Sequence, residues 1–377
     1  MSFSRVCAVV WMMVLLTVLY AQEHVYFEHI NKSTGLSNTA VSSIVQDSQG
    51  FMWFGTQGGL NRFDGYEFRT FKKKPFDSNS LSHDLVQTMY MDTDDILWIG
   101  TYNGLNRFDL HTGRITRFEH IPGDHDSLSN DVVVSIQRDN AGQLWVGTLN
   151  GLNVLNEDEG TFRHYYHDPQ TAGSISHNTI RSIFQDSRGR MWFGTYGGLN
   201  LYNPGTDDFT AYTHVKDDPV SIGNNNVMSI AQTSAGELWL GTWGGGGLTR
   251  FDIDTGKSTN YTLPDNRSYV LNTQKEGVIY VGTWGGGLIE FLPATGEHQQ
   301  YTSESYDSAS IDHNIVYSLY YDESGVLWIG TNGGGIDKMK KPDNDFTFWQ
   351  HNPDDPASLS EGKVTAVLRD SRGVLWV

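Results

Sequence analysis

The sequence has 377 residues, of which 38% are hydrophobic and 12% aromatic, a composition that supports a packed core and argues against a disordered chain. Its 41 glycines, 18 tyrosines and 11 tryptophans are typical of many short strands joined by tight turns. The formal charge of −18 repels polyanions, so no nucleic-acid partner is expected, although the same acidity also serves solubility alone.

Residues 1–21 have the features of an export signal peptide. Arg5 supplies a positive charge, residues 6–20 form an apolar stretch, and Ala21 suits the position before a cleavage site. We therefore predict a periplasmic or otherwise extracytoplasmic protein, with an uncleaved membrane anchor as the alternative. The single cysteine, Cys7, lies inside this segment, so the mature chain is predicted to contain neither a disulfide nor a cysteine nucleophile.

Residues 25–29 precede the first repeat and are predicted to form an isolated fourth strand. The sequence Phe27-Glu28-His29-Ile30 also occurs as residues 118–121, at the end of a later repeat. An N-terminal strand that pairs with the last blade is a common way to close a propeller without an open edge. Residues 346–351 are a second candidate for the same place, so the sequence leaves the closure undecided.

A motif of the form Leu-Trp-x-Gly-Thr recurs along the remaining chain. Its aromatic residue lies 41 to 48 residues from the next copy, at Trp53, Trp98, Trp145, Trp192, Trp239, Tyr280, Trp328 and Trp376. An apolar run precedes each motif, a Gly-containing hairpin follows it, and two further strand-like segments complete the repeat. Four strands repeated at this period predict an all-β protein, a β-propeller of four-stranded antiparallel blades.

The repeats also suggest domain boundaries. Seven complete repeats predict a seven-bladed propeller over residues 22–362. An eighth repeat begins near Lys363 and reaches only the first residues of its motif by Val377. We therefore expect residues 363–377 to start a further blade or a second propeller of a longer protein.

The full repeat, Asp-x-x-Gly-x-Leu-Trp-x-Gly-Thr-x-x-Gly-Leu-x-Arg-Phe-Asp, resembles the two-component regulator propeller repeat. Residues 47–64 and 92–109 are clear copies, the latter with Asp95 in the place of the glycine. The resemblance implies the sensor region of a bacterial membrane receptor. In such receptors two propellers are usually followed by a β-sandwich, a membrane span, and a histidine kinase, often hybrid, or a diguanylate cyclase. It further implies a homodimer formed through the full-length receptor, attachment to the inner membrane through a downstream segment, and in many relatives an oligosaccharide ligand.

The residue after each Gly-Thr is predicted to lie near the central channel, where loops between strands and between blades share one face. In blades five to seven, extra glycines lengthen the hairpin beside Trp243, Trp284 and Asn332. The two tryptophans offer flat apolar faces for a sugar ring, or alternatively act as wedges between blades. Tyr102 and Tyr196 occupy the same position in earlier blades and are weaker candidates.

A second set of candidates lies at the entry to each blade. His177 and His313 recur there, together with Asn38, His83, Asn130 and Asn224. These side chains either line the channel and bind a polar ligand, or satisfy backbone groups of their own loops, which is the commoner role of such residues.

Enzyme function is not predicted for these residues. The Asp-to-Gly spacing differs from that of sialidase Asp-boxes, and the Thr-Gly pairs lie in turns rather than before the tryptophans as in quinone-dependent dehydrogenases. We expect no catalytic residue, no metal and no cofactor. The predicted function is ligand sensing for a two-component receptor, with an oligosaccharide or other small polar ligand. The alternative is a non-signalling scaffold or a polysaccharide-active propeller.

Overall fold

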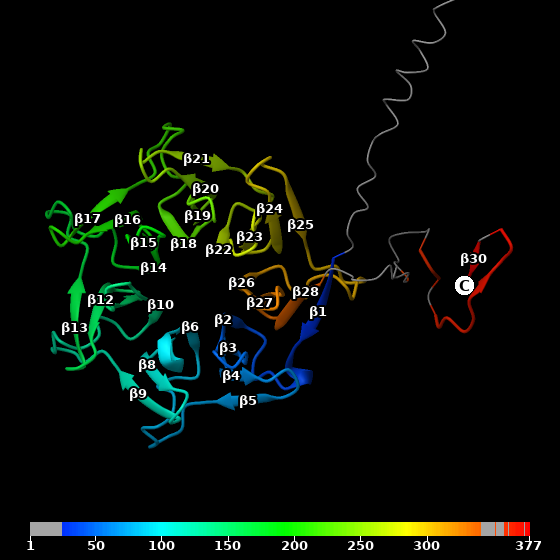
Figure 1. The fold of residues 1–377 in the computed structure, drawn as a ribbon, viewed down its shortest axis with the longest axis horizontal. Helices are drawn as coiled ribbons and strands as arrows, with labels where there is room; N and C mark the ends of the chain where they lie inside the picture. Colours follow the sequence, from blue (N-terminus) through cyan, green and yellow to red (C-terminus); the bar gives the residue numbers. More distant parts are fainter. Residues whose placement is uncertain (1–24, 341–350, 352–357, 361, 373) are drawn as a thin grey trace, which may run out of the picture.

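The computed structural model describes residues 25–340, 351, 358–360, 362–372 and 374–377. Seven four-stranded antiparallel sheets are arranged around a central axis as a seven-bladed β-propeller (Figure 1). No α-helix occurs among the described residues, and only two short 3-10 turns interrupt the strands, η1 (Lys32–Thr34) and η2 (Thr93–Asp95). The predicted fold class is therefore confirmed.

Each blade contributes one strand to each of four concentric rings. The innermost strands are β2 (Val41–Gln46), β6 (Val86–Met91), β10 (Val133–Arg138), β14 (Ile180–Gln185), β18 (Asn226–Gln232), β22 (Ser268–Asn272) and β26 (Val316–Tyr321). The motif strands are β3 (Met52–Thr56), β7 (Ile96–Thr101), β11 (Leu144–Thr148), β15 (Met191–Thr195), β19 (Leu238–Trp243), β23 (Ile279–Thr283) and β27 (Leu327–Thr331). The third strands are β4 (Gly59–Phe63), β8 (Gly104–Asp109), β12 (Gly151–Asn156), β16 (Gly198–Asn203), β20 (Gly247–Phe251), β24 (Leu288–Phe291) and β28 (Ile336–Lys340). The outer strands are β5 (Phe68–Phe71), β9 (Arg114–Phe118), β13 (Thr161–Tyr165), β17 (Asp208–Tyr212), β21 (Ser258–Tyr261), β25 (His298–Tyr301) and β1 (Tyr26–Ile30).

The core consists of apolar layers between adjacent blades. Trp98 of blade 2, for example, packs with Val133, Leu144 and Phe162 of blade 3 and is fully buried. Because strand residues alternate between faces, the leucine of the motif points to the opposite layer from the tryptophan, and both faces of each sheet are covered. Burial of each large apolar side chain contributes about 1.5–3 kcal/mol.

The N-terminal strand closes the ring. β1 pairs antiparallel with β28, from Tyr26 opposite Lys340 to Ile30 opposite Ile336, and so forms the outer strand of blade 7. The predicted fourth strand at residues 25–29 is confirmed. Of the competing candidate, residues 346–351, all but His351 lie outside the described residues.

The two Phe-Glu-His-Ile sequences that suggested this strand, residues 27–30 and 118–121, do not occupy equivalent positions in their blades. Ile30 pairs with Ile336, the residue after the hairpin glycine, whereas in blade 2 the corresponding partner of Leu105 is Phe118. Ile30 is thus equivalent to Phe118, and the two Phe-Glu-His-Ile sequences are offset by three residues. The similarity found the right strand in the wrong register.

The eighth repeat forms a separate short hairpin, β29 (Leu368–Arg369) with β30 (Leu375–Trp376). The indole of Trp376 donates to Asp370 over 3.3 Å, as tryptophans do in complete blades. Its apolar side chains are exposed, Trp376 by 57% and Leu368 by 66%. The predicted signal segment, residues 1–21, lies outside the described residues. Among the residues that are described, none of the helical turns has the length and apolar character that a membrane crossing requires.

Candidate ligand site at the central channel

A β-bulge in the innermost strand of every blade leaves one residue without a partner in the ladder. In β14, Ile180 pairs with Thr195 and Ser182 with Gly194, so Arg181 has no partner in the ladder. The same irregularity occurs in all seven innermost strands and leaves seven equivalent residues out of register: Ser42, Gln87, Val134, Arg181, Met228, Tyr269 and Tyr317. Because the innermost strands surround the axis (Figure 1), these residues, here called the channel ring, all lie on the strands that form the channel wall, Met228 being buried and the other six partly exposed.

Four large aromatic side chains gather at one side of this channel. Trp243, Tyr269, Trp284 and Tyr317, here called the aromatic cluster, come from blades 5 to 7. The ring centroids of Trp243 and Trp284 are 4.8 Å apart, and Trp284 lies 5.4 Å from Tyr269 and 5.3 Å from Tyr317. All four side chains are partly buried, so each packs against its neighbours and keeps some surface open. Burial raises the pKa of the Tyr317 phenol to about 12, which keeps this hydroxyl a neutral hydrogen-bond donor.

Arg181 connects the aromatic cluster to the opposite part of the ring. Its Nη2 donates to the hydroxyl of Tyr269 over 2.9 Å, although Arg181 belongs to blade 4 and Tyr269 to blade 6. The guanidinium carbon also lies 5.6 Å from the centre of the Tyr269 ring. This contact passes blade 5 and shows that side chains of the ring meet across the channel.

The hairpins of blades 5 to 7 differ from the others as predicted. In blade 4 the hydroxyl of Thr195 donates to the carbonyl of Gly198, three residues later. The equivalent bond spans five residues in blade 5, from Thr242 to Gly247, and four in blade 6, from Thr283 to Gly287. Each longer hairpin starts beside a member or neighbour of the aromatic cluster, so the extra glycines lie at the same end of the channel.

The hairpins and the blade-entry loops share one face, which was also predicted. The amide of Gly151 donates to the carbonyl of Asn178 in the next entry loop, and Gly287 does the same to Asn314. The backbone amide of Trp284 donates to Arg267, directly before β22. Backbone pairing therefore holds the residue after Gly-Thr next to the start of an innermost strand.

The blade-entry residues make local backbone contacts. His177 Nδ1 accepts from the amide of Thr179 over 2.9 Å, and His313 Nδ1 accepts from Ile315 over 3.0 Å. Equivalent bonds are made by Asn38, His83, Asn130 and Asn224. Burial lowers the pKa of His177, so its Nε2 hydrogen is the group that stays available to a ligand.

The remaining predicted residues, Tyr196, Tyr102 and Asn332, are not members of the aromatic cluster. Tyr196 packs against His177 of its own blade, with ring centroids 5.9 Å apart, and is 40% exposed. Tyr102 is 45% exposed and influences the Tyr317 phenol electrostatically, which places it near the cluster. Asn332 forms an isolated β-bridge with Ala40 and so joins blade 7 to blade 1.

Sequence reasoning missed Tyr269, Tyr317 and Arg181. The only signal was position, since each is the second residue of an innermost strand whose other copies carry small, apolar or amide side chains. A charged residue inside the apolar run of residues 180–183 was the most visible of these departures.

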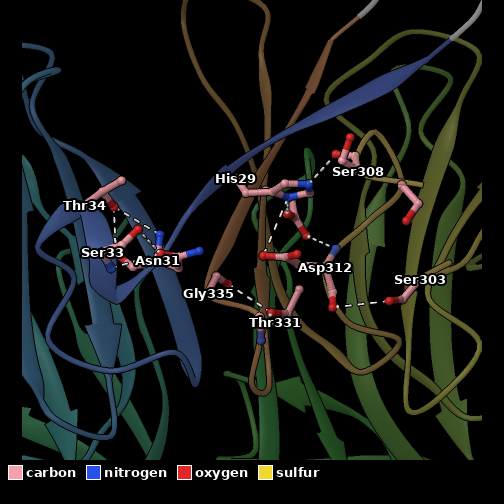
Figure 2. Close-up of polar contacts among 12 residues, drawn as sticks. His29, Asn31, Ser33, Thr34, Ser303, Ser308, Asp312, Thr331 and Gly335 are labelled. Atoms are coloured by element: carbon pink, nitrogen blue, oxygen red, sulfur yellow. Dashed lines mark hydrogen bonds and ion pairs between the residues drawn. The ribbon is translucent and has the colours of Figure 1, made fainter. Parts of the chain in front are cut away.

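A second polar group lies at the closure of the ring. His29 Nδ1 lies 2.5 Å from a carboxylate oxygen of Asp337 and 3.7 Å from one of Asp312. Figure 2 shows His29 between Asp312 and Ser308, whose carbonyl is contacted by His29 Nε2. The three side chains are close enough to share a metal ion. However, the buried Asp337 raises the pKa of His29 to about 9, and both imidazole nitrogens face acceptors. A protonated histidine paired with Asp337 accounts for the arrangement.

The fold and the channel define the class of protein: a seven-bladed propeller whose ring of bulged residues carries an asymmetric cluster of aromatic side chains. The two-component regulator propeller family model matches residues 35–58, 80–103, 127–150, 174–197, 221–244 and 310–333. The chain therefore carries six two-component regulator propeller repeats, and blade 6, with Tyr280 in place of the tryptophan, falls between the fifth and sixth matches.

Similar proteins include extracellular domains of putative two-component systems. The extracellular domain of a putative hybrid two-component system from B. thetaiotaomicron superimposes with a TM-score of 0.77 and 25% identity, over 94% of this chain and 46% of that chain. A second such domain from B. thetaiotaomicron gives 0.68 and 24%, over 84% and 40%. A histidine kinase of Formosa agariphila is 43% identical over 54 residues, which cover 14% of this chain and 4% of the kinase. This chain thus spans less than half of these solved domains.

Proposed function

We propose that the propeller is the extracytoplasmic sensing region of a bacterial two-component receptor, and that it binds an oligosaccharide-like ligand at the central channel. Exported by residues 1–21, it would lie in the periplasm, with the receptor in the inner membrane. The repeats and the resemblance to extracellular domains of hybrid two-component systems support the receptor class. Kinase output and receptor dimerisation are part of the same proposal.

The observation that carries the ligand proposal is the aromatic cluster. Its four rings come from three blades, and the ring centroids of contacting pairs lie 4.8 to 6.2 Å apart. Sugar rings have apolar C–H faces that pack on aromatic faces, while hydroxyl groups bind polar side chains nearby. The cluster supplies the aromatic faces, and the Nε2 hydrogen of His177 and the phenol of Tyr317 are polar groups that can bind sugar hydroxyls.

Substitution of the two tryptophans tests this site. We expect Trp243→Ala and Trp284→Ala each to weaken oligosaccharide binding about tenfold, because each removes one stacking face. Isothermal titration calorimetry with the purified chain measures the change, after thermal-shift screening of glycans has identified a binder. Tyr66→Ala is the matched control, since Tyr66 is 92% exposed and lies outside the channel strands. Unchanged affinity in the Trp243→Ala/Trp284→Ala double variant contradicts the proposed site.

The alternative is a scaffold or polysaccharide-active propeller without signalling. Whether the purified chain cleaves a glycan that it binds distinguishes a polysaccharide-active propeller from the sensor. A glycan that binds and is cleaved by the purified chain supports the enzyme, whereas a glycan that is bound and recovered intact supports the sensor. If no glycan binds and the chain self-associates in sedimentation experiments, the propeller serves dimerisation instead.

A further inference from the structure

Arg181 lacks a carboxylate partner among the described residues, as do Arg62, Arg69, Arg114 and Arg117, and of these it alone belongs to the channel ring. Eight other arginines of the described residues pair with a carboxylate: Arg107, Arg138, Arg163, Arg188, Arg190, Arg250, Arg267 and Arg372. Arg181 lies within 4 Å of no carboxylate oxygen in the part of the chain that the structure describes, and its protein contacts are the hydroxyl and the ring of Tyr269. A guanidinium at the channel thus keeps an uncompensated positive charge.

The hydrogen-bond donors of Arg181 are largely unused. Of its five N–H groups, one on Nη2 meets the Tyr269 hydroxyl, and Nε is buried without an acceptor among the described residues. A buried donor without an acceptor is unfavourable, and buried polar groups in folded proteins nearly always find a partner. Beside this buried Nε–H, the remaining Nη hydrogens leave the guanidinium with donors for a further acceptor.

These unused donors of Arg181 lie next to the aromatic cluster, because Arg181 contacts Tyr269. Tyr269 contacts Arg181 on one side and lies 5.4 Å from Trp284 and 5.4 Å from Tyr317 on the other. A ring-shaped ligand that packs on the cluster therefore has its edge near the guanidinium. The side-chain amide of Gln87, another residue of the channel ring, makes no hydrogen bond within the described residues and adds further unused polar groups.

We propose that the ligand of this site is an acidic oligosaccharide, with its anionic group bound by Arg181 while a sugar ring packs on the aromatic cluster. The proposal rests on the proposed function and specifies its ligand class. The planar guanidinium binds both a uronic acid carboxylate and a sulfate ester through paired N–H donors. Either group supplies an acceptor for the unused guanidinium donors and neutralises the unpaired charge.

Matched ligand pairs test the proposal on the unaltered chain. The probes are oligomers of galacturonate, glucuronate and mannuronate, each with its carboxyl-reduced counterpart, and sulfated galactan oligosaccharides with their desulfated counterparts. Calorimetry is expected to show at least one acidic member binding about tenfold or more tighter than its neutral counterpart. The carboxylate and sulfate arms distinguish the two sources of negative charge.

Variants assign the effect to Arg181. Arg181→Gln removes the charge and is expected to abolish the preference for the acidic member, so that both members of a pair bind with about equal affinity. Arg181→Lys keeps the charge without the paired donors and is expected to retain part of this preference. Arg188→Gln is the matched control, because Arg188 is 61% exposed and pairs with Asp254 away from the channel. Circular dichroism and thermal unfolding establish that each variant folds.

The outcomes separate the two proposals. Equal binding of acidic and neutral members overturns the acidic ligand and leaves an oligosaccharide sensor in place. Retention of the acidic preference in Arg181→Gln also overturns the role of Arg181. If no member of any pair binds, both the acidic ligand and the oligosaccharide function fail.

Discussion

A hydrogen bond between an aspartate and the motif tryptophan recurs from blade to blade. Trp145 Nε1 donates to Asp139 over 2.8 Å, and Asp139 also accepts from the amides of Ala141 and Gln143 in its own turn. One carboxylate thereby fixes both the turn and the buried indole. In blade 5 the aspartate is replaced by Thr233, and both Trp239 Nε1 and the Thr233 hydroxyl are buried without a partner among the described residues.

We expect Thr233→Asp to stabilise the propeller by about 1 kcal/mol, because it restores the acceptor that Trp239 lacks and caps the turn. The turn already has the required backbone form, with the Gly236 amide donating to the Thr233 carbonyl over 2.8 Å. Urea unfolding measures the free energy of unfolding. Ser234→Asp introduces the same charge at the next, exposed position. A Thr233→Asp variant no more stable than Ser234→Asp would show that the indole gains nothing from the carboxylate.

At the scale of the element, β1 is chemically matched to β28. The third strands of blades 1 to 4 carry an asparagine after the Gly-Leu pair, and Asn106 accepts from the Ser82 amide and donates to the Ile99 carbonyl. Blade 7 has Asp337 at this place, fully buried, which accepts from the Asp312 amide but has no hydrogen to donate. His29 of β1 supplies the proton instead. The closing strand is therefore selected by charge as well as by apolar packing.

This pair makes stability depend on pH. The His29 pKa is raised to about 9 by Asp337, against about 6.5 in the unfolded chain, so its contribution is complete below pH 6.5 and is lost as pH rises to 9. We expect the propeller to lose on the order of 2 kcal/mol across this window, measured by urea unfolding at several pH values. The double variant His29→Thr/Asp337→Asn reproduces the Thr70–Asn61 pair of blade 1 and should lack this slope. Parallel pH profiles for the two proteins would contradict the role of His29.

The sequence predicted the blades well because one repeat contains all the local information that a blade needs. The turn residues, the alternation of apolar side chains along each strand and the hairpin glycine determine the four strands of a blade. Seven copies of this repeat then determine the ring. Trp243 and Trp284 could be singled out because the lengthened hairpins beside them break the repeat pattern visibly, and their role in ligand binding stays a prediction. Tyr269 and Arg181 were not found, because a bulge removes them from the paired register and their contact joins blades 4 and 6. Contacts between blades that are not neighbours have no signature within a single repeat.

At the scale of the whole molecule, stability depends on ring closure, since each blade has apolar neighbours on both sides only while the ring is complete. Phe27 packs with Tyr301 of blade 6, with ring centroids 5.6 Å apart, and Ile30 packs with Leu36 and Phe54 of blade 1. One five-residue strand thus contributes to the layers on both sides of blade 7.

We therefore expect removal of residues 1–30 to destabilise the whole propeller and not blade 7 alone. Loss of Phe27 and Ile30 removes two buried side chains worth about 1.5–3 kcal/mol each, and Asp337 loses its partner. Urea unfolding should show a lower midpoint and a broader transition than in a chain that lacks only residues 1–24 and keeps β1. A synthetic peptide of residues 25–34 should restore the midpoint in a concentration-dependent manner, because it adds back the missing edge strand. If both truncated chains unfold at the same urea concentration, β1 is a dispensable outer strand and the ring closes without it.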